Sequence, residues 1–273
     1  MKIKDFVITS RSNPLVNETV KLQKKRYRTE IGRFLIDGRK LSYEYIKTCG
    51  APICALVNEA VKDDIIAELV ILEQNIGEEI TVTLVSDGVF SKLTEQNSPD
   101  GIILIGDKNA LSYFESLNGI DENERVIILD SLQDPGNVGT LIRSALAFGF
   151  DRILLSRDSA DVFNSKTLRA SMGAIFSIKL TVISDLRDAV GLFLSQGRRV
   201  YSAELREKSV SLDLIEVAST DVFVIGNEGH GISEQLSEMC SASVYIPISE
   251  KSESLNAAVA GSVLMWHQHN YFD

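Results

Sequence analysis

The sequence predicts an α/β protein whose C-terminal part is a mostly parallel sheet with helices on both faces, preceded by a smaller α/β domain. Two observations support this prediction. Short apolar runs alternate with helical patterns along the chain, and a polar stretch rich in Asp, Asn and Gly interrupts them at 107–124. We therefore expect a domain at 1–106, a linker at 107–124 and a second domain at 125–273.

The elements expected in the first domain follow from periodicity and from signals at their ends. Asn13 before Pro14 is typical of a helix start, so a helix is expected at 13–28. Further strands are expected at 33–37, 53–57, 80–85 and 101–105, and further helices at 38–47 and 61–72. These elements make a small βαβα domain.

In the second domain, strands are expected at 126–130, 152–156, 177–183, 199–202, 222–226 and 243–246, with helical patterns between them and at 254–269. Such near-continuous apolar strands are typical of a parallel sheet that is covered on both faces. In such sheets ligands bind at the carboxyl ends of the strands, so the turns that follow the strands are where a site is expected.

Composition narrows the class of protein. The chain has 273 residues, of which 44% are hydrophobic and 24% charged, so it can form a full core. It has no apolar stretch of about 18 residues and no N-terminal signal peptide, so we expect no membrane contact. Cys49, Cys54 and Cys240 lack metal-ligand spacing. We therefore expect a cytoplasmic protein without a metal site.

The charge is divided unevenly along the chain. The net charge is −10, yet residues 1–48 hold 12 Lys and Arg against 5 Asp and Glu, which leaves −17 for the remainder. Binding to phosphates needs a local basic surface, and the first domain can supply one. The RNA-binding candidates are Lys21, Lys24, Lys25, Arg26, Arg28, Arg33 and Arg39. A solvated helix face is the alternative explanation for these charges.

The first strand of the second domain is followed by a turn that opens a helix. Asn137 is expected to cap this helix after Pro135 and Gly136. Arg143 is expected to point away from the core, and Gly139 one turn earlier is expected to leave space on the same outer face. An arginine beside such a space suits phosphate or carboxylate recognition, although an ordinary surface arginine remains an alternative.

Two later turns likewise follow a strand and lead into a helix. Residues 226–231 hold three glycines that allow close backbone approach to a ligand, with Glu228 at the strand tip. The segment matches neither the dinucleotide nor the P-loop pattern, and His230 within it is judged incidental. The third turn follows 246–248 and leads into a helix whose small residues at 257–262 suit either a helix or subunit contact or an ordinary core.

These segments resemble the SpoU/TrmH family of RNA ribose methyltransferases, within the SPOUT superfamily. Asp134–Arg143 resembles the first family motif, Ile225–Ser233 the second, and Ile246–Ile248 with Ser254–Ala260 the third. Arg169–Ala174 also matches a family segment. The N-terminal part resembles the family's substrate-binding domain, which has a ribosomal-protein-like fold.

The resemblance implies S-adenosylmethionine as methyl donor and a ribose 2′-hydroxyl, most readily in ribosomal RNA, as acceptor. It also implies a trefoil knot and a homodimer. By position, the catalytic set is Asn137, Arg143, Glu228, Ser254 and Asn256. The cofactor contacts are Gly226, Asn227, Gly229, Ile246, Ile248 and Leu255. A transfer-RNA methyltransferase and a non-catalytic RNA-binding relative are the alternatives.

Arg143 and Glu250 each bear on the chemistry of the site that the resemblance implies. Arg143 is the family's candidate for activating the hydroxyl, but arginine stays protonated in proteins. We therefore expect it to position the ribose and to stabilise developing oxyanion charge, with an RNA phosphate as proton relay. The family's third motif usually has a glycine where this chain has Glu250, which puts the local turn in doubt.

Overall fold

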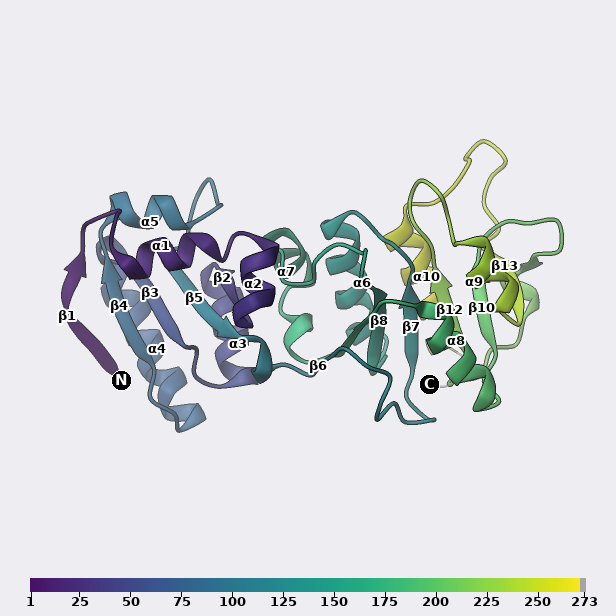
Figure 1. The fold of residues 1–273 in the computed structure, drawn as a ribbon, viewed down its shortest axis with the longest axis horizontal. Coiled ribbons are helices and arrows are strands. Elements are labelled where there is room, and N and C mark those ends of the chain that lie inside the picture. Colours follow the sequence, from purple (N-terminus) through teal and green to yellow (C-terminus); the bar gives the residue numbers. More distant parts are fainter. Residues whose placement is uncertain (271–273) are drawn as a thin grey trace. The chain divides into compact units, whose positions relative to one another are not determined.

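The computed structural model describes residues 1–270 and divides into two compact units (Figure 1). Unit 1 comprises Met1–Leu111 and Phe163–Ser177, and unit 2 comprises Ser112–Val162 and the chain from Ile178 onward. Each unit is built on its own sheet. No helix of residues 1–270 is long and apolar enough to cross a membrane.

Unit 1 contains a five-stranded mixed sheet. Its strands, in spatial order, are β1 (Lys2–Ile8), β4 (Thr81–Val85), β3 (Cys54–Asn58), β5 (Ile102–Asp107) and β2 (Arg33–Asp37). Strand β5 runs antiparallel to both of its neighbours, and the other pairs are parallel. Strand β1 was not predicted from the sequence, because the charged residues Lys2 and Lys4 interrupt the apolar pattern of a strand.

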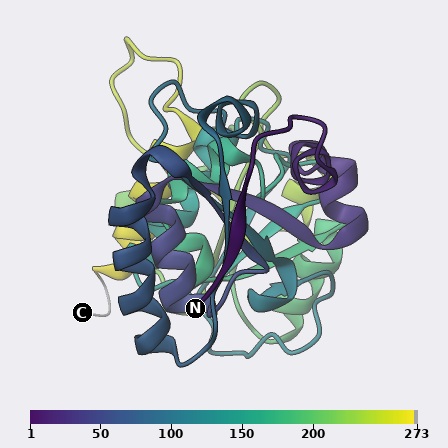
Figure 2. The same cartoon turned by 90° about the vertical axis from the view of Figure 1, so that its left-hand side faces the viewer.

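Helices cover both faces of this sheet, as Figure 2 shows. One face holds α1 (Pro14–Lys21), α2 (Lys25–Ile31) and α5 (Asp87–Leu93), and the other holds α3 (Arg39–Cys49) and α4 (Lys62–Ile76). Asn13 caps α1 as predicted, but the single helix expected at 13–28 is wrong. The chain bends where Leu22 and Gln23 donate to carbonyls only three residues back, and the bend buries Leu22 in the core.

A segment from the second half of the chain also packs in unit 1. It contains α7 (Ser165–Ser171) and a 3₁₀ turn, η3 (Ala174–Phe176). Phe163 lies 4.7 Å from the ring of Phe34, and Phe176 meets the ring of Tyr45 edge-on at 5.3 Å. Aromatic packing therefore fixes both ends of this segment on unit 1.

Unit 2 contains an eight-stranded sheet in which every pair of neighbouring strands is parallel, within the described residues. The strands, in spatial order, are β11 (Val210–Ser211), β13 (Ala242–Tyr245), β10 (Val200–Ala203), β12 (Val222–Ile225), β7 (Val126–Leu129), β8 (Arg152–Ser156), β9 (Lys179–Ile183) and β6 (Tyr113–Phe114). The predicted fold class is confirmed. Strand order reverses between β7 and β12, so a ligand site is expected where these two strands end.

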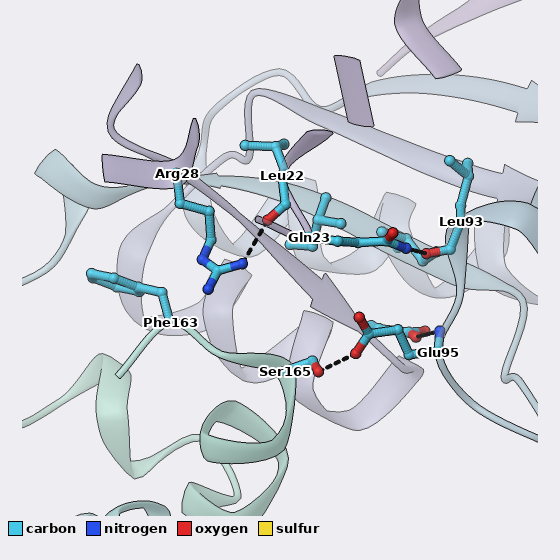
Figure 3. A pocket seen from close by; sticks show the side chains of 10 residues that line it. Leu22, Gln23, Arg28, Leu93, Glu95, Phe163 and Ser165 are labelled. Carbon is cyan, nitrogen blue, oxygen red and sulfur yellow. Dashed lines mark hydrogen bonds between the residues drawn. The ribbon is translucent and has the colours of Figure 1, made fainter. Parts of the chain in front are cut away.

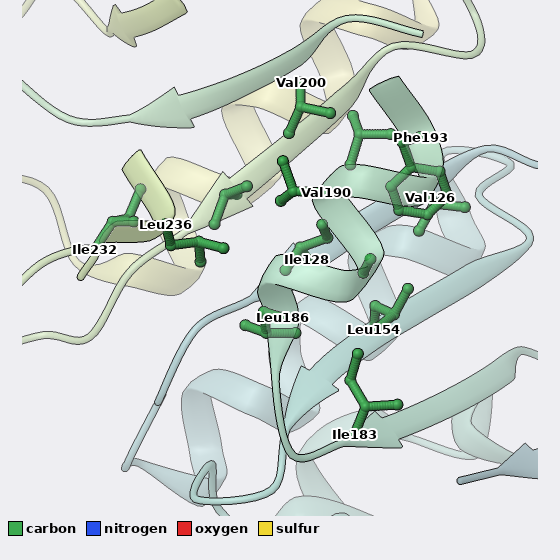
Figure 4. Packing of buried hydrophobic residues seen from close by; sticks show 13 residues of the cluster. Val126, Ile128, Leu154, Ile183, Leu186, Val190, Phe193, Val200, Ile232 and Leu236 are labelled. Carbon is green, nitrogen blue, oxygen red and sulfur yellow. The ribbon is translucent and has the colours of Figure 1, made fainter. Parts of the chain in front are cut away.

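Helices cover both faces of this sheet as well. On one face, α8 (Leu186–Ser195) and α9 (Glu234–Met239) pack on alternate residues of the strands, with Phe193 fully buried among valines and isoleucines (Figure 4). The other face carries α6 (Pro135–Ala147) and α10 (Ala257–His269). A Cβ at Gly261 would lie 2.4 Å from the side chain of Leu141, so this small residue lets α10 pack closely on α6.

Several short elements complete the chain. Three further 3₁₀ turns are η1 (Glu59–Val61), η2 (Lys108–Ala110) and η4 (Leu212–Leu214). The segment 107–124, expected as a linker, contains η2 and the strand β6, which pairs with β9 at the edge of the sheet in unit 2. The division at 106 and 125 remains a prediction.

Candidate active site

The turn after β7 places Asn137 inside helix α6. Asp134 is the N-cap, and its carboxylate accepts hydrogen bonds from the backbone N–H groups of Gly136 and Asn137 at 2.5 and 3.0 Å. The expectation that Asn137 caps this helix is therefore wrong. Pro135 occupies the first helical position, which assigns the cap to the residue before it, and this signal was present in the sequence. The side chain of Asn137 is left for other contacts.

Those contacts join all three motifs. The Asn137 amide donates to the carboxylate of Glu228 at 2.8 Å, and the Asn256 amide donates to the Asn137 carbonyl oxygen at 3.0 Å. In sequence, Asn137 is 91 positions from Glu228 and 119 positions from Asn256. We call Asn256, Asn137 and Glu228 the amide relay. It fixes the orientation of the Asn137 amide, because each of its two ends has a defined partner.

Glu228 is held as an anion. Its carboxylate also accepts from the backbone N–H groups of Gln133 and Asp134 at 3.2 and 3.4 Å. Partial burial raises the pKa of Glu228, but the bond from Asn137 and the backbone N–H groups outweigh it, so the pKa lies below its ordinary value. At neutral pH this residue therefore supplies negative charge and orientation.

The turn after β12 is a closed loop that requires glycine. Asn227 and Gly231 form two backbone hydrogen bonds of 3.0 Å, and a Cβ at Gly226 would lie 2.4 Å from the carbonyl carbon of Gly231. The Asn227 side chain accepts from the N–H groups of Gly229 and His230 and donates to the Ser131 carbonyl at 2.6 Å. The loop therefore holds its shape and is tied to the turn after β7.

The third motif begins helix α10. Asn256 is its N-cap and accepts from the backbone N–H groups of Ala258 and Val259 at 2.9 and 3.3 Å. Ser254 is exposed, and its carbonyl accepts from the hydroxyl of Ser252. Among the described residues other than glycine, positive φ occurs at Ser131 and Met172. Glu250 therefore adopts its turn without needing the glycine of the family.

Arg143 lies on the exposed face of α6, as predicted, two turns after the start of the helix. The space expected beside it is not provided by Gly139, which is buried. Gly139 faces the core together with Val138 and Ile142, because the helix packs along a wider stripe than the sequence pattern suggested. A guanidinium in solvent on this face is free to meet an anionic ligand.

The residues expected to hold the methyl donor fit that role. Ile246 and Leu255 are half-buried and Ile248 is 39% exposed, so they offer apolar surface for an adenine ring. Gly226 has no side chain, so a ligand can approach its backbone groups closely. No group of three or more His, Cys, Asp or Glu in residues 1–270 is placed to hold a metal ion.

The RNA-binding candidates divide into two groups. Four cations on α1, α2 and the bend between them are exposed: Lys21, Lys24, Lys25 and Arg26. Arg33 is also exposed, and Arg39 is half-buried 3.8 Å from Glu68. Arg28 is buried and donates to the Leu22 carbonyl at 2.8 Å, beside Phe163 (Figure 3). Arg28 therefore holds the bend between α1 and α2, and this role was not foreseen.

Comparisons with known proteins identify the family of this chain. Residues 124–266 match the SpoU rRNA methylase family, and residues 13–104 match the MRM3-like substrate-binding domain. The 23S rRNA (guanosine(2553)-2′-O)-methyltransferase RlmP of Bacillus subtilis is 31% identical over 260 residues, which cover 95% of this chain and 98% of that relative.

Solved structures show the same architecture over the whole chain. An AdoMet-bound rRNA methyltransferase from Sinorhizobium meliloti superposes with a TM-score of 0.83 at 26% identity, covering 99% of each chain. The SpoU methyltransferase AviRb from Streptomyces viridochromogenes shares the fold, with a TM-score of 0.81 at 21% identity and coverage of 95% of this chain and 98% of that one.

The fold and the site thus define an RNA methyltransferase that uses S-adenosylmethionine and acts on a ribose 2′-hydroxyl. The chain belongs to the SpoU rRNA methylase family. The family and the class of reaction predicted from the sequence are both confirmed.

Proposed function

We propose that this protein methylates a ribose 2′-hydroxyl in large-subunit ribosomal RNA, with the amide relay and Arg143 as its catalytic centre. The observation that supports this most is the relay itself, because Asn256, Asn137 and Glu228 come from three distant motifs and meet within 2.8 to 3.0 Å. The RlmP relative acts on 23S rRNA, which favours that substrate.

The residues around the relay can do what the reaction requires. When bound, S-adenosylmethionine supplies an electrophilic methyl group on its sulfonium. Ile246, Ile248 and Leu255 hold the donor through apolar contact, and Gly226 holds it through backbone groups. Asn137 and Glu228 orient the ribose by hydrogen bonds, and orientation of the reacting atoms is a major requirement of an in-line displacement.

Arg143 stabilises the developing oxyanion and the adjacent phosphate of the RNA. It acts as a charge, because arginine remains protonated in proteins. A phosphate oxygen of the RNA takes the hydroxyl proton. Ser254 lies at the exposed entrance to α10 and contacts the substrate.

The RNA is bound by the exposed cations of unit 1. Lys21, Lys24, Lys25 and Arg26 lie within six positions of each other on α1, α2 and the bend between them, which creates a local basic surface on an acidic protein. Such a surface supplies phosphate contacts and recognises RNA by shape.

We also propose a cytoplasmic homodimer that pairs through α10. Val259 and Trp266 are 49% and 52% exposed, and with Thr140 and Val263 they line a shallow hollow of about 280 Å³. An apolar hollow on an otherwise well-packed helix pair is typical of a protein interface. Sedimentation of the wild type and of Trp266→Glu tests this: a dimer and a monomer, respectively, are expected, and a monomeric wild type contradicts it.

The experiment for the reaction is transfer of labelled methyl from S-adenosylmethionine to unmodified 23S rRNA, 16S rRNA and tRNA, followed by mapping of the 2′-O-methyl group. Label in 23S rRNA alone is expected. Arg143→Ala should lower the rate by about 100-fold or more while donor binding persists. Label in tRNA alone would contradict the substrate, and no label in any RNA would contradict the reaction.

A further inference from the structure

The turn after β7 contains a residue in a strained backbone conformation. Ser131 has a φ of 56°, in the left-handed region that residues other than glycine rarely adopt. Among the described residues other than glycine, Met172 alone shares this conformation, and it ends helix α7, where a left-handed residue is common. Ser131 caps no helix. It follows the carboxyl end of β7, and strained residues gather at functional sites where their surroundings fix them.

Hydrogen bonds hold every polar group of Ser131. Its backbone N–H donates to the Ser156 hydroxyl at 2.8 Å. Its own hydroxyl donates to the carboxylate of Asp130 or of Asp158, at 3.0 and 2.9 Å. Its carbonyl accepts from the side-chain amide of Asn227 at 2.6 Å. The bond from Asn227 is the shortest of these, and it joins the turn after β7 to the turn after β12.

Asn227 uses its side chain within the protein. Its side-chain carbonyl accepts from the backbone N–H groups of Gly229 and His230 at 2.8 and 3.1 Å, while its amide nitrogen donates to Ser131. Both ends of this amide are therefore oriented by groups of the protein itself. The resemblance implied that Asn227 contacts the methyl donor, and these bonds favour instead a role in holding the two turns together.

The bond between Asn227 and Ser131 is a neighbour of the bonds that hold Glu228. Glu228 is the residue after Asn227, and its carboxylate accepts from the backbone N–H groups of Gln133 and Asp134 at 3.2 and 3.4 Å. These two N–H groups belong to the segment that leaves Ser131. The backbone conformation of Ser131 therefore sets where they point, and the bond from Asn227 fixes the two turns against each other.

We propose that Ser131 and Asn227 are positioning residues for methyl transfer, an inference that rests on the proposed function. The left-handed turn at Ser131, held by the Asn227 amide, keeps Glu228 in register with the turn after β7 and so orients the amide relay. Neither side chain needs to touch the RNA or the methyl donor. A misplacement of about 1 Å can lower a rate by about 100-fold, so loss of this link should lower kcat.

Two substitutions at Ser131 separate its backbone from its hydroxyl. Ser131→Gly removes the hydroxyl but adopts the left-handed conformation without strain, so kcat for methyl transfer to 23S rRNA should stay close to that of the wild type. Ser131→Thr keeps the hydroxyl, but its β-branched side chain disfavours positive φ, so kcat should fall by about tenfold or more. Met172→Thr introduces the same strain in unit 1 and is the matched control. It should lower the melting temperature and leave kcat unchanged.

The isosteric variant Asn227→Asp tests the link itself. It keeps the acceptor for the N–H groups of Gly229 and His230 but replaces the donor to the Ser131 carbonyl by an oxygen. With saturating donor and RNA, kcat should fall by about tenfold or more. The KM for RNA should not change, nor should S-adenosylmethionine binding measured by calorimetry without RNA. Asn118→Asp, at an exposed position of unit 2, adds the same charge and should behave as the wild type.

Four outcomes would overturn the proposal. An active wild type with the same kcat as Asn227→Asp would refute the link while leaving the proposed function intact. Weaker donor binding by Asn227→Asp, with kcat unchanged at saturating donor, would make Asn227 a donor contact. Equal losses in Ser131→Gly and Ser131→Thr would assign the effect to the hydroxyl instead of the backbone. No methyl transfer by the wild type to any RNA would refute the proposed function and this role together.

Discussion

Two glutamates lie at opposite ends of the parallel strands in unit 2, and their hydrogen bonds serve different purposes. Glu124 precedes β7, where its carboxylate contacts Arg152 Nε at 2.6 Å and Lys179 Nζ at 2.6 Å. Glu228 follows β12 and is held by Asn137 and by backbone N–H groups. The first carboxylate is buried and neutralised by cations, and the second is exposed and held by neutral groups.

The difference shows how one sheet separates stability from chemistry. At the amino ends of the strands, Glu124 and Arg152 are only 6% and 1% exposed, so their charges must be paired. At the carboxyl ends, Glu228 keeps its negative charge because the groups that hold it carry none. We expect substitutions at the amino ends of the strands to lower the free energy of unfolding. Substitutions at the carboxyl ends should instead lower the methylation rate.

The largest expected effect is on stability. Glu124→Ala leaves the buried guanidinium of Arg152 without its carboxylate and should lower the free energy of unfolding by about 3–5 kcal/mol. Urea unfolding of the variant measures this, with Glu238→Ala on the exposed side of α9 as control. A loss below about 1 kcal/mol, the range of exposed ion pairs, would contradict the comparison.

The next largest effect is expected on the methylation rate, from a substitution at the carboxyl ends of the strands. Asn137→Ala removes the donor to Glu228 and should lower kcat by about 100-fold. The melting temperature should hardly change, because Asn137 is inside α6 and alanine is a good helix former. Asp134→Ala should instead cost about 1 kcal/mol of stability, as expected for the true N-cap. The reverse pattern would restore Asn137 as the cap.

A smaller effect is expected on RNA affinity, which should depend on neither the ion pairs of Glu124 nor the amide relay. The double variant Lys25→Gln, Arg26→Gln should reduce the slope of log affinity against log salt by about 1 for each cation that no longer meets a phosphate. Filter binding to 23S rRNA at several salt concentrations measures it. Lys208→Gln, an exposed lysine of unit 2, is the control and should leave the slope unchanged.

The smallest effect is a dependence of stability on pH. Burial raises the pKa of Glu124, but the hydrogen bonds and charges of Arg152 and Lys179 outweigh it, so its pKa in the folded protein is lowered. Its stabilisation is therefore complete above the unfolded pKa of about 4.3 and is lost as pH falls through the folded value. Urea midpoints between pH 7 and pH 3.5 should fall less steeply for Glu124→Gln than for the wild type. Parallel profiles would contradict this.

Most of the fold could be predicted because the strands of unit 2 are continuous apolar runs between clear turns. The bend between α1 and α2 could not, since 22–24 contain neither glycine nor proline and the break depends on tertiary packing of Leu22. The position of 163–177 in unit 1 could not be predicted either, because it depends on aromatic contacts to Phe34 and Tyr45, which are distant in sequence.

The candidate site was predictable in its residues but not in its geometry. The three motifs identify Asn137, Glu228 and Asn256, yet only the structure shows that their side chains form one relay. Arg28 is a residue whose role could not be predicted from the sequence. A run of cations in sequence does not show which member is buried, and Arg28 stabilises the bend while its neighbours face solvent.

The most direct test of the amide relay is a double-mutant cycle on the single-turnover rate of methyl transfer to 23S rRNA. Asn256→Ser keeps a capping side chain on α10 but is too short to reach Asn137, and Asn137→Ala removes the central member. If the relay acts as a unit, the double variant should be hardly slower than Asn137→Ala alone, with a coupling energy of about 1 kcal/mol or more. Independent, additive losses would contradict the relay.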